Sequence, residues 1–568
     1  GICGAANNIW NNDSGNFVWD SVSSNWQGPA TWDNAASDIA IFRAGGAGAI
    51  TVGAPVSARA ISFQANGYTL SGPANRPITL TSGGVGLIGP AEIGVIASEA
   101  KIASPLAGTF GLKKSGGGKL ILTAASSYVG DTQISGGTLQ LGDGASSGSL
   151  LGDIDVGSAG TLAFANPGVT VFSGAIAGAG SLLAAGPDDS ALALTGNVGL
   201  GMGVQIARGT LSVGGGGTTG NLAGNVVNQS TLEFHRTSAM SYDDVISGDG
   251  TVRKLGSALL NLTGENSYTG DTEILDGTLQ LFGSGSFASS RNVVVHNTAT
   301  LVAESLSGGL NHDGESFALA PAQSLTGGGL IRGNVAVREQ ATLAPGEPVG
   351  SMVVDGDVKF EPGSTLAVHL NGATDSDAER SRLVVSGSLA FGGTALPINP
   401  FTVHVINTGG FDGTVATSFL VASADSIVSQ GLDTPIDLTV GADGSGAAGL
   451  QVRLSVTDFD PGAHFSLQRS GSHLALSFVP APTLLQADFD GDGDVDAFDL
   501  AIWENAYGTN SQGDADSDGD SDGQDFMAWQ RQFGAPAQTP ASVSVPEPSA
   551  ALLAASLALC IKGRRIER

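Results

Sequence analysis

The stretch that decides the fold is KLGSALLNLTGENSYTGDTEILDGTLQL, which runs from Lys254 to Leu281. A similar stretch, KSGGGKLILTAASSYVGDTQISGGTLQL, runs from Lys114 to Leu141, and the two align without a gap. A third, degenerate copy lies between Leu192 and Gly214. Self-similarity of this kind indicates a repeat architecture and not chance composition.

A shorter period of about 22 residues lies within these copies. A small residue followed by Thr-Leu recurs at one or two multiples of that length, beginning at Gly137, Gly160, Gly209, Ser230, Gly277, Ala299, Ala341 and Ser364. Each begins an alternating stretch such as GTLQL, which places the leucine and the next apolar residue on one buried face. Turns of this length predict a right-handed parallel β-helix, a mainly β solenoid whose inward side chains stack in a ladder. An array of β-sandwiches is the alternative architecture.

The composition agrees with a chain of many short strands and turns. Of its 568 residues, 86 are glycine, 41% are hydrophobic, 14% are charged and 6% are aromatic. Glycine-rich sequence with few charges is unlike a helical enzyme. The formal net charge of −29 predicts no nucleic-acid partner, because such a partner requires a basic face that displaces counterions.

The repeat carries a resemblance to a known family. LTGENSYTGDTEILDGTLQL resembles the autotransporter-associated β-strand repeat, also called the passenger-associated repeat. The segment from Ser324 to Asp357 resembles the sequence that follows such repeats, and the segment from Phe17 to Phe42 resembles their tryptophan-rich start. The resemblance spans roughly residues 10 to 400. It implies a β-solenoid that is exported to the cell surface or the extracellular space of a Gram-negative envelope.

Four of the six tryptophans, Trp10, Trp19, Trp26 and Trp32, lie in the first 32 residues. The exposed end of a solenoid would invite pairing with another chain, so one interpretation is that these side chains cap the first turn. The other interpretation is a platform on which sugars of an extracellular polysaccharide stack.

The solenoid could also house an active site, since glycoside hydrolysis needs two carboxylates about 5–10 Å apart. The candidates are Asp131 and Asp271, which stand at equivalent positions of the two repeats. A recurring residue is more typical of a turn former, because a catalytic pair is assembled once. The seven histidines are dispersed, and no metal, nucleophile-elbow or phosphate-loop motif occurs. The sequence therefore favours a protein that is not an enzyme.

Two aspartate-rich stretches stand near the other end of the chain. DFDGDGDVDAFD runs from Asp488 to Asp499, and DADSDGDSDGQD runs from Asp514 to Asp525. Each has carboxylates at positions 1, 3, 5, 9 and 12 and a glycine, Gly493 or Gly519, at position 6. This spacing suits Ca²⁺, which takes six to eight oxygen ligands from one sharply turning loop. The alternative is a disordered acidic linker.

Aspartate at position 12, a helix after each loop and no entering helix resemble the duplicated loop-helix of a type I dockerin, over about residues 486 to 535. The resemblance implies two Ca²⁺ ions and a cohesin-like protein partner. Its implied ligands are Asp488, Asp490, Asp492, Asp494, Asp496, Asp499, Asp514, Asp516, Asp518, Asp520, Asp522 and Asp525. Asp494 and Asp520 would use main-chain oxygen, and Asp496 and Asp522 would act through water. The implied partner-binding residues are Ala497, Phe498, Gly523 and Gln524.

The two loops are not identical. Position 8 is Val495 in the first loop but Ser521 in the second, which predicts a looser apolar contact between the loops. The partner-binding pairs also differ, so the sequence does not favour two equivalent docking modes.

The last residues form a third feature. VPEPS precedes an apolar run from Ala550 to Ile561 and the basic end KGRRIER. As a helix this run reaches only about 18 Å, short of a stable membrane span. The order of these parts resembles a PEP-CTERM sorting signal, which an exosortase processes. The resemblance implies that Pro546, Glu547 and Pro548 mark processing, and that Arg564 and Arg565 orient a transient membrane anchor. A simple hydrophobic helix is the alternative.

These features predict seven segments. They are a signal-peptide remnant (1–9), a Trp-rich cap with the first β-turns (10–110), β-helix repeats (111–400), a C-terminal β region (401–485), a dockerin-like calcium module (486–535), a Pro/Ser linker (536–545) and a sorting tail (546–568).

The predicted function is an exported scaffold or adhesin-like protein with calcium-dependent docking. A β-helix polysaccharide lyase or glycosidase carried by a dockerin-like module is the alternative, and glycan binding without catalysis is a third.

Overall fold

The computed structural model describes residues 7–27, 31–35, 38–81, 89–346, 349–372, 380–392, 400–409, 411, 416–428, 436–439, 443–445, 451–457, 459, 464–480 and 485–534. Most of the predicted signal remnant, the linker and the sorting tail, including Pro546, Glu547, Pro548, Arg564 and Arg565, lie outside them. The chain forms two units, residues 1–343 with 352–358, and residues 344–351 with 359–568.

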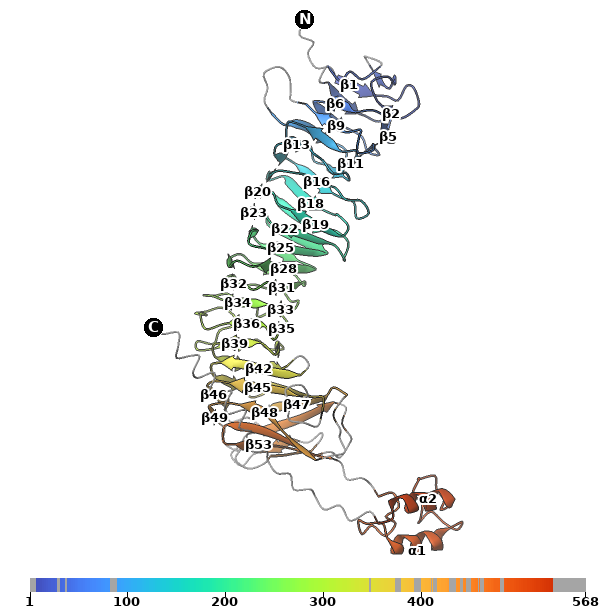
Figure 1. Cartoon of the computed structure of the whole chain (residues 1–568), viewed down its shortest axis with the longest axis vertical. Coiled ribbons are helices and arrows are strands. Elements are labelled where there is room, and N and C mark those ends of the chain that lie inside the picture. Colours follow the sequence, from blue (N-terminus) through green and yellow to red (C-terminus); the bar gives the residue numbers. More distant parts are fainter. Residues whose placement is uncertain are drawn as a thin grey trace. The chain divides into compact units, whose positions relative to one another are not determined.

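The first unit is a parallel β-solenoid. Figure 1 shows its short strands stacked turn upon turn from β1 onward. One face is an eleven-stranded sheet made of β1 (Asn7–Trp10), β3 (Trp26–Gln27), β4 (Ile39–Phe42), β7 (Ala60–Phe63), β10 (Ala91–Val95), β13 (Leu112–Ser115), β15 (Thr132–Ile134), β17 (Ile154–Val156), β20 (Ile176–Gly178), β23 (Asn197–Leu200) and β26 (Asn221–Ala223).

A second eleven-stranded sheet forms another face. It contains β2 (Val18–Trp19), β5 (Ala49–Val52), β8 (Thr69–Ser71), β11 (Glu99–Ala103), β14 (Lys119–Leu122), β16 (Gly137–Leu141), β18 (Gly160–Phe164), β21 (Ser181–Ala185), β24 (Val204–Arg208), β27 (Val226–Asn228) and β30 (Ile246–Ser247). A small third sheet comprises β6 (Val56–Ala58), β9 (Ile78–Leu80) and β12 (Leu106–Gly108).

Three further ladders continue the first unit. One contains β19 (Val169–Phe172), β22 (Ala191–Leu194), β25 (Thr210–Gly217), β28 (Thr231–Arg236), β31 (Thr251–Leu255), β33 (Thr272–Ile274), β35 (Asn292–Val295) and β38 (Ser324–Gly327). Another contains β29 (Met240–Tyr242), β32 (Leu259–Leu262), β34 (Gly277–Leu281), β36 (Ala299–Val302) and β39 (Leu330–Arg332). The last pairs β37 (Phe317–Leu319) with β40 (Val335–Val337). Residues of both units occur in β41 (Thr342–Pro345), β42 (Gly350–Asp355) and β43 (Val358–Phe360).

The register explains the sequence period. Leu139 on β16 pairs with Leu162 on β18 in parallel, one turn further along the chain, and Leu279 on β34 pairs with Leu301 on β36 in the same way. All four side chains are buried, so equivalent leucines stack into the ladder that the Thr-Leu period predicts. The predicted parallel β-solenoid is therefore confirmed for the first unit, and the β-sandwich array is wrong there.

The tryptophan-rich start caps this solenoid. Trp10, Trp19, Trp26 and Trp32 are all buried and pack edge to face or tilted against one another, with centroids 4.8–5.4 Å apart. β3 pairs antiparallel with β1 and so covers the edge of the first turn. No ring presents a free face to a sugar, so the cap interpretation holds and the sugar-stacking interpretation is wrong for these four residues.

Each quoted repeat contains a buried lysine. Lys114 Nζ donates to the carbonyls of Ser115, Gly116 and Gly136, each at 2.9 Å. Lys254 Nζ makes the equivalent three bonds in the second repeat, at 2.5–3.1 Å. Burial lowers the pKa of each lysine to about 8. Three carbonyls satisfy all three N–H groups of the ammonium, so each lysine joins consecutive turns from inside.

These two lysines should make the stability of the first unit depend on pH. Between pH 8 and 10.5 the unfolded chain binds more protons than the folded chain, so the free energy of unfolding should rise with pH. The slope is at most about 1.4 kcal/mol per pH unit for each lysine. Above about pH 10 the trend should reverse, because burial raises the pKa of Tyr128 to about 12 and only the unfolded chain then loses that proton. Denaturant unfolding at pH 7.5, 8.5 and 9.5 measures the slope, and the double variant Lys114→Met/Lys254→Met should be flat. If the free energy of unfolding rises equally with pH in the unaltered protein and in the double variant, the two lysines do not titrate in this range.

The second unit begins with parallel strands and continues with antiparallel ones. Its strands are β44 (Thr365–Leu370), β45 (Ser381–Val385), β46 (Ser388–Phe391), β47 (Phe401–Asn407), β48 (Thr417–Ser423), β49 (Ser426–Val428), β50 (Ile436–Thr439), β51 (Asp443–Ser445), β52 (Gln451–Thr457), β53 (His464–Ser470) and β54 (His473–Val479). β44, β47 and β52 pair in parallel, whereas β54 pairs antiparallel with both β48 and β53.

The same unit contains two helices, α1 (Ala497–Ala506) and α2 (Gly523–Gln532). Neither they nor any other helix in the described ranges has the length and apolar character needed to cross a bilayer.

Candidate metal centre

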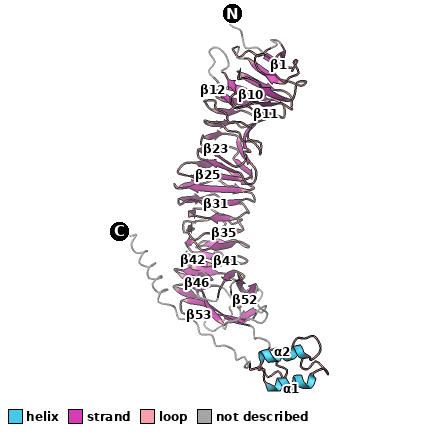
Figure 2. Ribbon diagram, turned by 45° about the vertical axis from the view of Figure 1, so that its right-hand side comes forward, coloured by secondary structure: helices cyan, strands magenta, loops and turns pink. Residues whose placement is uncertain are grey.

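The two helices, drawn in cyan in Figure 2, each begin within the last three residues of an aspartate-rich stretch. We call residues 488–499 loop 1 and residues 514–525 loop 2. The Asp496 carboxylate accepts from Phe498 N at 2.7 Å, and the Asp499 carboxylate accepts from Asp496 N at 2.8 Å. Asp522 and Asp525 repeat this arrangement in loop 2. Such a reciprocal capping box satisfies N–H groups that helix geometry leaves free, and it fixes where each helix begins.

The loops gather carboxylate oxygens into four clusters, within each of which one oxygen per residue lies within 4.8 Å of the others. Loop 1 provides two clusters and loop 2 provides two that share Asp525. The clusters are Asp488–Asp490–Asp492, Asp494–Asp496–Asp499, Asp514–Asp516–Asp525 and Asp520–Asp522–Asp525. Eleven of the twelve predicted ligands therefore come together, and Asp518 is the one outside these clusters.

The position-12 residues organise the loops from inside. Asp499 is fully buried, and its Oδ1 accepts from Phe489 N at 2.7 Å and Asp490 N at 3.2 Å in addition to the cap bond. Asp525 makes the same bonds with Ala515 N and Asp516 N. Gly493 and Gly519 have φ of +95° and +102°, where a side chain would be strained, so the sharp turn at position 6 needs glycine.

The donor set fits a hard divalent cation. Every side chain in the clusters offers oxygen, and none offers nitrogen or sulfur. Asp494 Oδ1 is buried and has no hydrogen-bond partner, which a cation would satisfy. Calcium takes six to eight such oxygens and tolerates irregular geometry, so these residues could hold it. The dockerin resemblance implies main-chain ligand roles for Asp494 and Asp520, whereas the structure places both of their carboxylates in clusters.

Aspartates of both loops have raised pKa values, in part because neighbouring carboxylates repel one another. The pKa of Asp494 is raised by partial desolvation and then by the neighbouring charges of Asp492 and Asp496. The pKa of Asp520 is raised first by the charge of Asp518 and then by desolvation. Like charges held this close favour the protonated form, and a cation between them relieves the repulsion.

A small apolar core joins the two halves. Ala487, Val495, Ala515 and Trp529 are buried together. Ser521, the residue equivalent to Val495, is also fully buried, and its Oγ accepts from Gly513 N at 3.0 Å. The contact at position 8 is thus apolar in loop 1 and hydrogen-bonded in loop 2. A core of this size is marginal by itself, so bound metal would contribute much of the stability of the module.

The predicted partner-binding residues are accessible. Ala497, Gly523 and Gln524 are exposed, and Phe498 leaves 70% of its surface in solvent. A phenylalanine exposed to this degree at a helix start is available for an apolar contact.

Two residues of this centre were missed by the sequence analysis. Trp503 Nε1 of α1 donates to Asp522 O in loop 2 at 2.8 Å, and Trp529 Nε1 of α2 donates to Asp496 O in loop 1 at the same distance. Both tryptophans stand at position 16 counted from the start of their loop. Alignment of the two halves beyond position 12 would have shown this signal.

The alternative carboxylates of the solenoid behave as structural residues. Asp131 Oδ1 accepts from Asp153 N one turn along at 3.4 Å, and Asp271 Oδ1 accepts from Asn292 Nδ2 at 2.8 Å. They immediately precede different strands, β15 and β33, and each joins its turn to the next.

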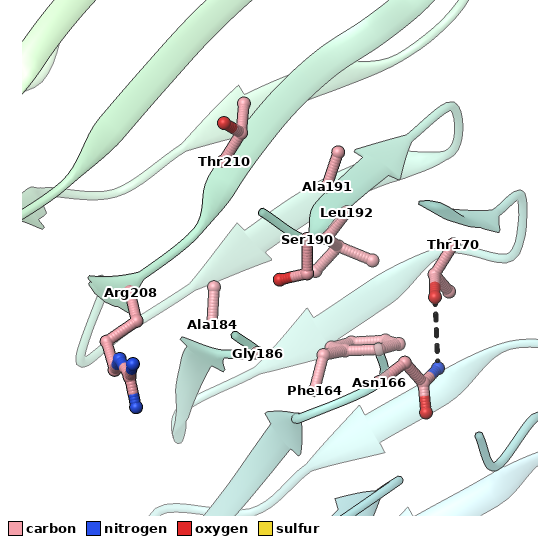
Figure 3. Close-up of a pocket in the computed structure, with 10 residues that line it drawn as sticks. All are labelled: Phe164, Asn166, Thr170, Ala184, Gly186, Ser190, Ala191, Leu192, Arg208 and Thr210. Carbon is pink, nitrogen blue, oxygen red and sulfur yellow. Dashed lines mark hydrogen bonds between the residues drawn. The ribbon is translucent and has the colours of Figure 1, made fainter. Parts of the chain in front are cut away.

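A small pocket lies in the first unit and is lined by residues between 164 and 210. Figure 3 shows it between strands of the first unit, with Phe164, Asn166 and Ser190 in its wall and a hydrogen bond from Asn166 to Thr170. Its volume of about 10 Å³ has room for one water. Arg208 is the one charged residue that lines it, and this side chain pairs with Asp188. The pocket therefore lacks the paired carboxylates of a glycosidase.

Two serine–histidine contacts occur among the described residues of the second unit, and one of them joins the sequence neighbours Ser472 and His473. The other joins two strands. Ser381 Oγ lies 3.3 Å from His369 Nδ1, but it also accepts from His369 N at 2.7 Å. Ser381 is 1% exposed, so no substrate reaches its hydroxyl group. The contact is a structural bond between β44 and β45.

Fold and site together define a parallel β-solenoid protein with an acidic two-loop module. The passenger-associated-transport-repeat family matches residues 112–141 and 252–281, which coincide with the two quoted copies. The resemblance to passenger repeats is confirmed over these residues.

Two curated proteins resemble part of the chain. An "Adhesin BmaC autotransporter" of Brucella suis biovar 1 (strain 1330) is 36% identical over 178 residues, which cover 30% of this chain and 5% of that protein. An "Extracellular serine protease" of Serratia marcescens is 32% identical over 173 residues, which cover 29% of this chain and 14% of that protein. The chain thus spans a small part of the length of both relatives.

Proposed function

We propose that the chain is an exported, non-enzymatic scaffold of the cell surface or extracellular matrix, with an adhesin-like role. The similarity to an autotransporter adhesin supports export and surface exposure. The observation that best supports the proposal is that the same side-chain bonds occur in both repeats. Lys114 and Lys254 make the same three bonds, and Tyr128 and Tyr268 each bond a threonine four residues on at 2.6 Å. A catalytic site is assembled once, whereas repeated bonds serve the scaffold.

The acidic module is proposed to bind two Ca²⁺ ions and then to dock a cohesin-like protein. Loop 1 would hold one ion through its six aspartates and loop 2 the other. The clustered oxygens, the unpartnered Asp494 Oδ1 and the exposed Phe498 support this role. The ion would supply the positive charge that orders the loops, and the exposed faces of α1 and α2 would then contact the partner.

The docking proposal is tested with the full chain immobilised and a panel of purified cohesin-like domains. Binding should occur in millimolar Ca²⁺ and disappear with a chelator. Phe498→Ala should weaken binding at least tenfold, as for an anchor at an interface centre, while its calcium affinity stays unchanged. Tyr507→Ala, an exposed aromatic at the other end of α1, is the matched control. Binding that survives the chelator would refute calcium-dependent docking.

Incubation of the protein with polysaccharide from the envelope of the producing cells distinguishes the scaffold from the enzyme alternative. Adsorption of the protein without release of reducing ends or unsaturated uronides supports an adhesive role. Release of either product would overturn the proposal in favour of a lyase or glycosidase.

The tail is proposed to be processed by an exosortase after transient anchoring. The order VPEPS, apolar run and Arg564–Arg565 in the sequence supports it. Intact-mass analysis of the exported protein tests it, since an unshortened mass would contradict processing.

A further inference from the structure

The two acidic loops are tied to each other by reciprocal bonds. The Trp503 indole, on the helix that follows loop 1, donates to Asp522 O in loop 2. The Trp529 indole, on the helix that follows loop 2, donates to Asp496 O in loop 1. Both distances are 2.8 Å, so each helix holds a carbonyl of the opposite loop. Neither loop is anchored only by its own helix.

The chain just beyond each helix makes a second reciprocal pair. Gly508 N, after α1, donates to Ser521 O in loop 2 at 2.9 Å. Gly534 N, after α2, donates to Val495 O in loop 1 at the same distance. Positions 8 and 9 of each loop are therefore both held by the other half of the module, and position 9 is a member of a carboxylate cluster.

Aromatic rings connect the two indoles. Phe526 lies 4.8 Å from Trp503 and 5.6 Å from Trp529, measured between ring centroids. Because Phe526 contacts both indoles, a displacement of one indole also displaces a residue that packs against the other. Close packing transmits such shifts because a dense interior does not deform continuously.

The two carbonyls that the indoles hold belong to residues of the carboxylate clusters. Asp496 caps α1, and its carboxylate lies in a cluster with Asp494 and Asp499. Asp522 does the same for α2, with Asp520 and Asp525. Fixing the carbonyl of position 9 thus fixes the backbone from which one ligand carboxylate extends.

We infer that Trp503 and Trp529 couple the two loops, so that a divalent cation bound in one loop raises the affinity of the other. The inference rests on the proposed calcium binding and specifies how that site is regulated. An empty loop repels itself and is costly to order. The first cation orders its own loop and helix, the indole of that helix then fixes the opposite loop, and the second cation meets a loop that is already arranged. Trp503 and Trp529 are positioning residues and not ligands.

Calcium titration calorimetry of the full chain tests the inference. Loop 1 is inactivated by Asp490→Asn with Asp492→Asn, and loop 2 by Asp516→Asn with Asp518→Asn; a variant with all four changes gives the background of other acidic sites. We define the coupling as the ratio of one loop's Ca²⁺ affinity when the other loop is intact to its affinity when the other loop is inactivated. This ratio should be about tenfold, within the usual range for linked sites. Trp503→Phe and Trp529→Phe keep a ring but remove the donor, and each should reduce the coupling to about twofold or less. Tyr507→Phe, which removes a hydroxyl from the same module, should leave it unchanged.

Hydrogen–deuterium exchange provides a measurement that needs no tryptophan variant. In the variant with loop 2 inactivated, Ca²⁺ bound in loop 1 should slow exchange in residues 514–525. Loops that bind calcium independently, with no such protection, would overturn the coupling and leave calcium binding intact. Absence of calcium binding in every variant would overturn both.

Discussion

Alanine at Gly277 is expected to destabilise the solenoid by about 2–5 kcal/mol, the sum of a left-handed backbone penalty and overpacking. Gly277 begins β34 with φ of +69°, and a Cβ there would lie 2.4 Å from Gly256 O in the preceding turn. Because the obstacle is backbone of a neighbouring turn, no rotamer change relieves it. Gly137, its counterpart in the other repeat, meets Gly118 O at 2.4 Å and should behave alike.

Gly283 is the matched control. Its φ is +63°, but a Cβ there has nothing within 4 Å. Gly283→Ala should therefore cost only the backbone term, about 1–2 kcal/mol. Denaturant unfolding followed by circular dichroism, with hydrogen exchange of residues 251–302, measures both. Equal losses at the two positions would mean that the close stacking of turns at Gly277 does not limit stability.

Removal of divalent cations is expected to disorder the acidic module while the solenoid stays folded. If the loops hold the proposed calcium, they would lose the positive charge that offsets their repulsion, and a core as small as the one around Trp529 is marginal alone. Amide exchange in residues 485–534 should then approach that of an unfolded peptide. The far-ultraviolet β signal of the chain should persist in the same sample.

Asp499→Ala should have a similar local effect even with calcium present. It removes a buried carboxylate that accepts three backbone N–H bonds, and we expect a loss of about 3–5 kcal/mol, as for breaking a buried charged network. Glu504→Ala makes the same charge change at an exposed position of α1 outside the clusters. If residues 485–534 are protected from amide exchange to the same degree in both variants, the Asp499 carboxylate does not organise loop 1.

The solenoid could be predicted from sequence because its determinants are local and recur. Leu139 and Leu279 reveal their buried faces by alternation within five residues, and the period then dictates which leucine lies above which. The clustering of carboxylates in the two loops could be predicted for the same reason, because the aspartates of each loop lie within twelve consecutive residues. The capping boxes at Asp496 and Asp522 follow from that same short stretch.

Residues whose partners are distant were harder to interpret. The sequence around Lys114 and Lys254 does not indicate that each side chain points inward onto carbonyls of its own and the next turn. The tryptophans of the cap supported two interpretations, and only their mutual burial decided between them.

By itself the sequence determined the period of the solenoid, the inward leucines and the clustering of acidic side chains in two loops, because each depends on spacing along a few consecutive residues. Only the tertiary structure decided that lysine ammoniums join successive turns and that Trp503 and Trp529 each hold the opposite loop. Those bonds join groups brought together by folding, and a side chain's own neighbours in the chain do not specify which distant carbonyl it will meet.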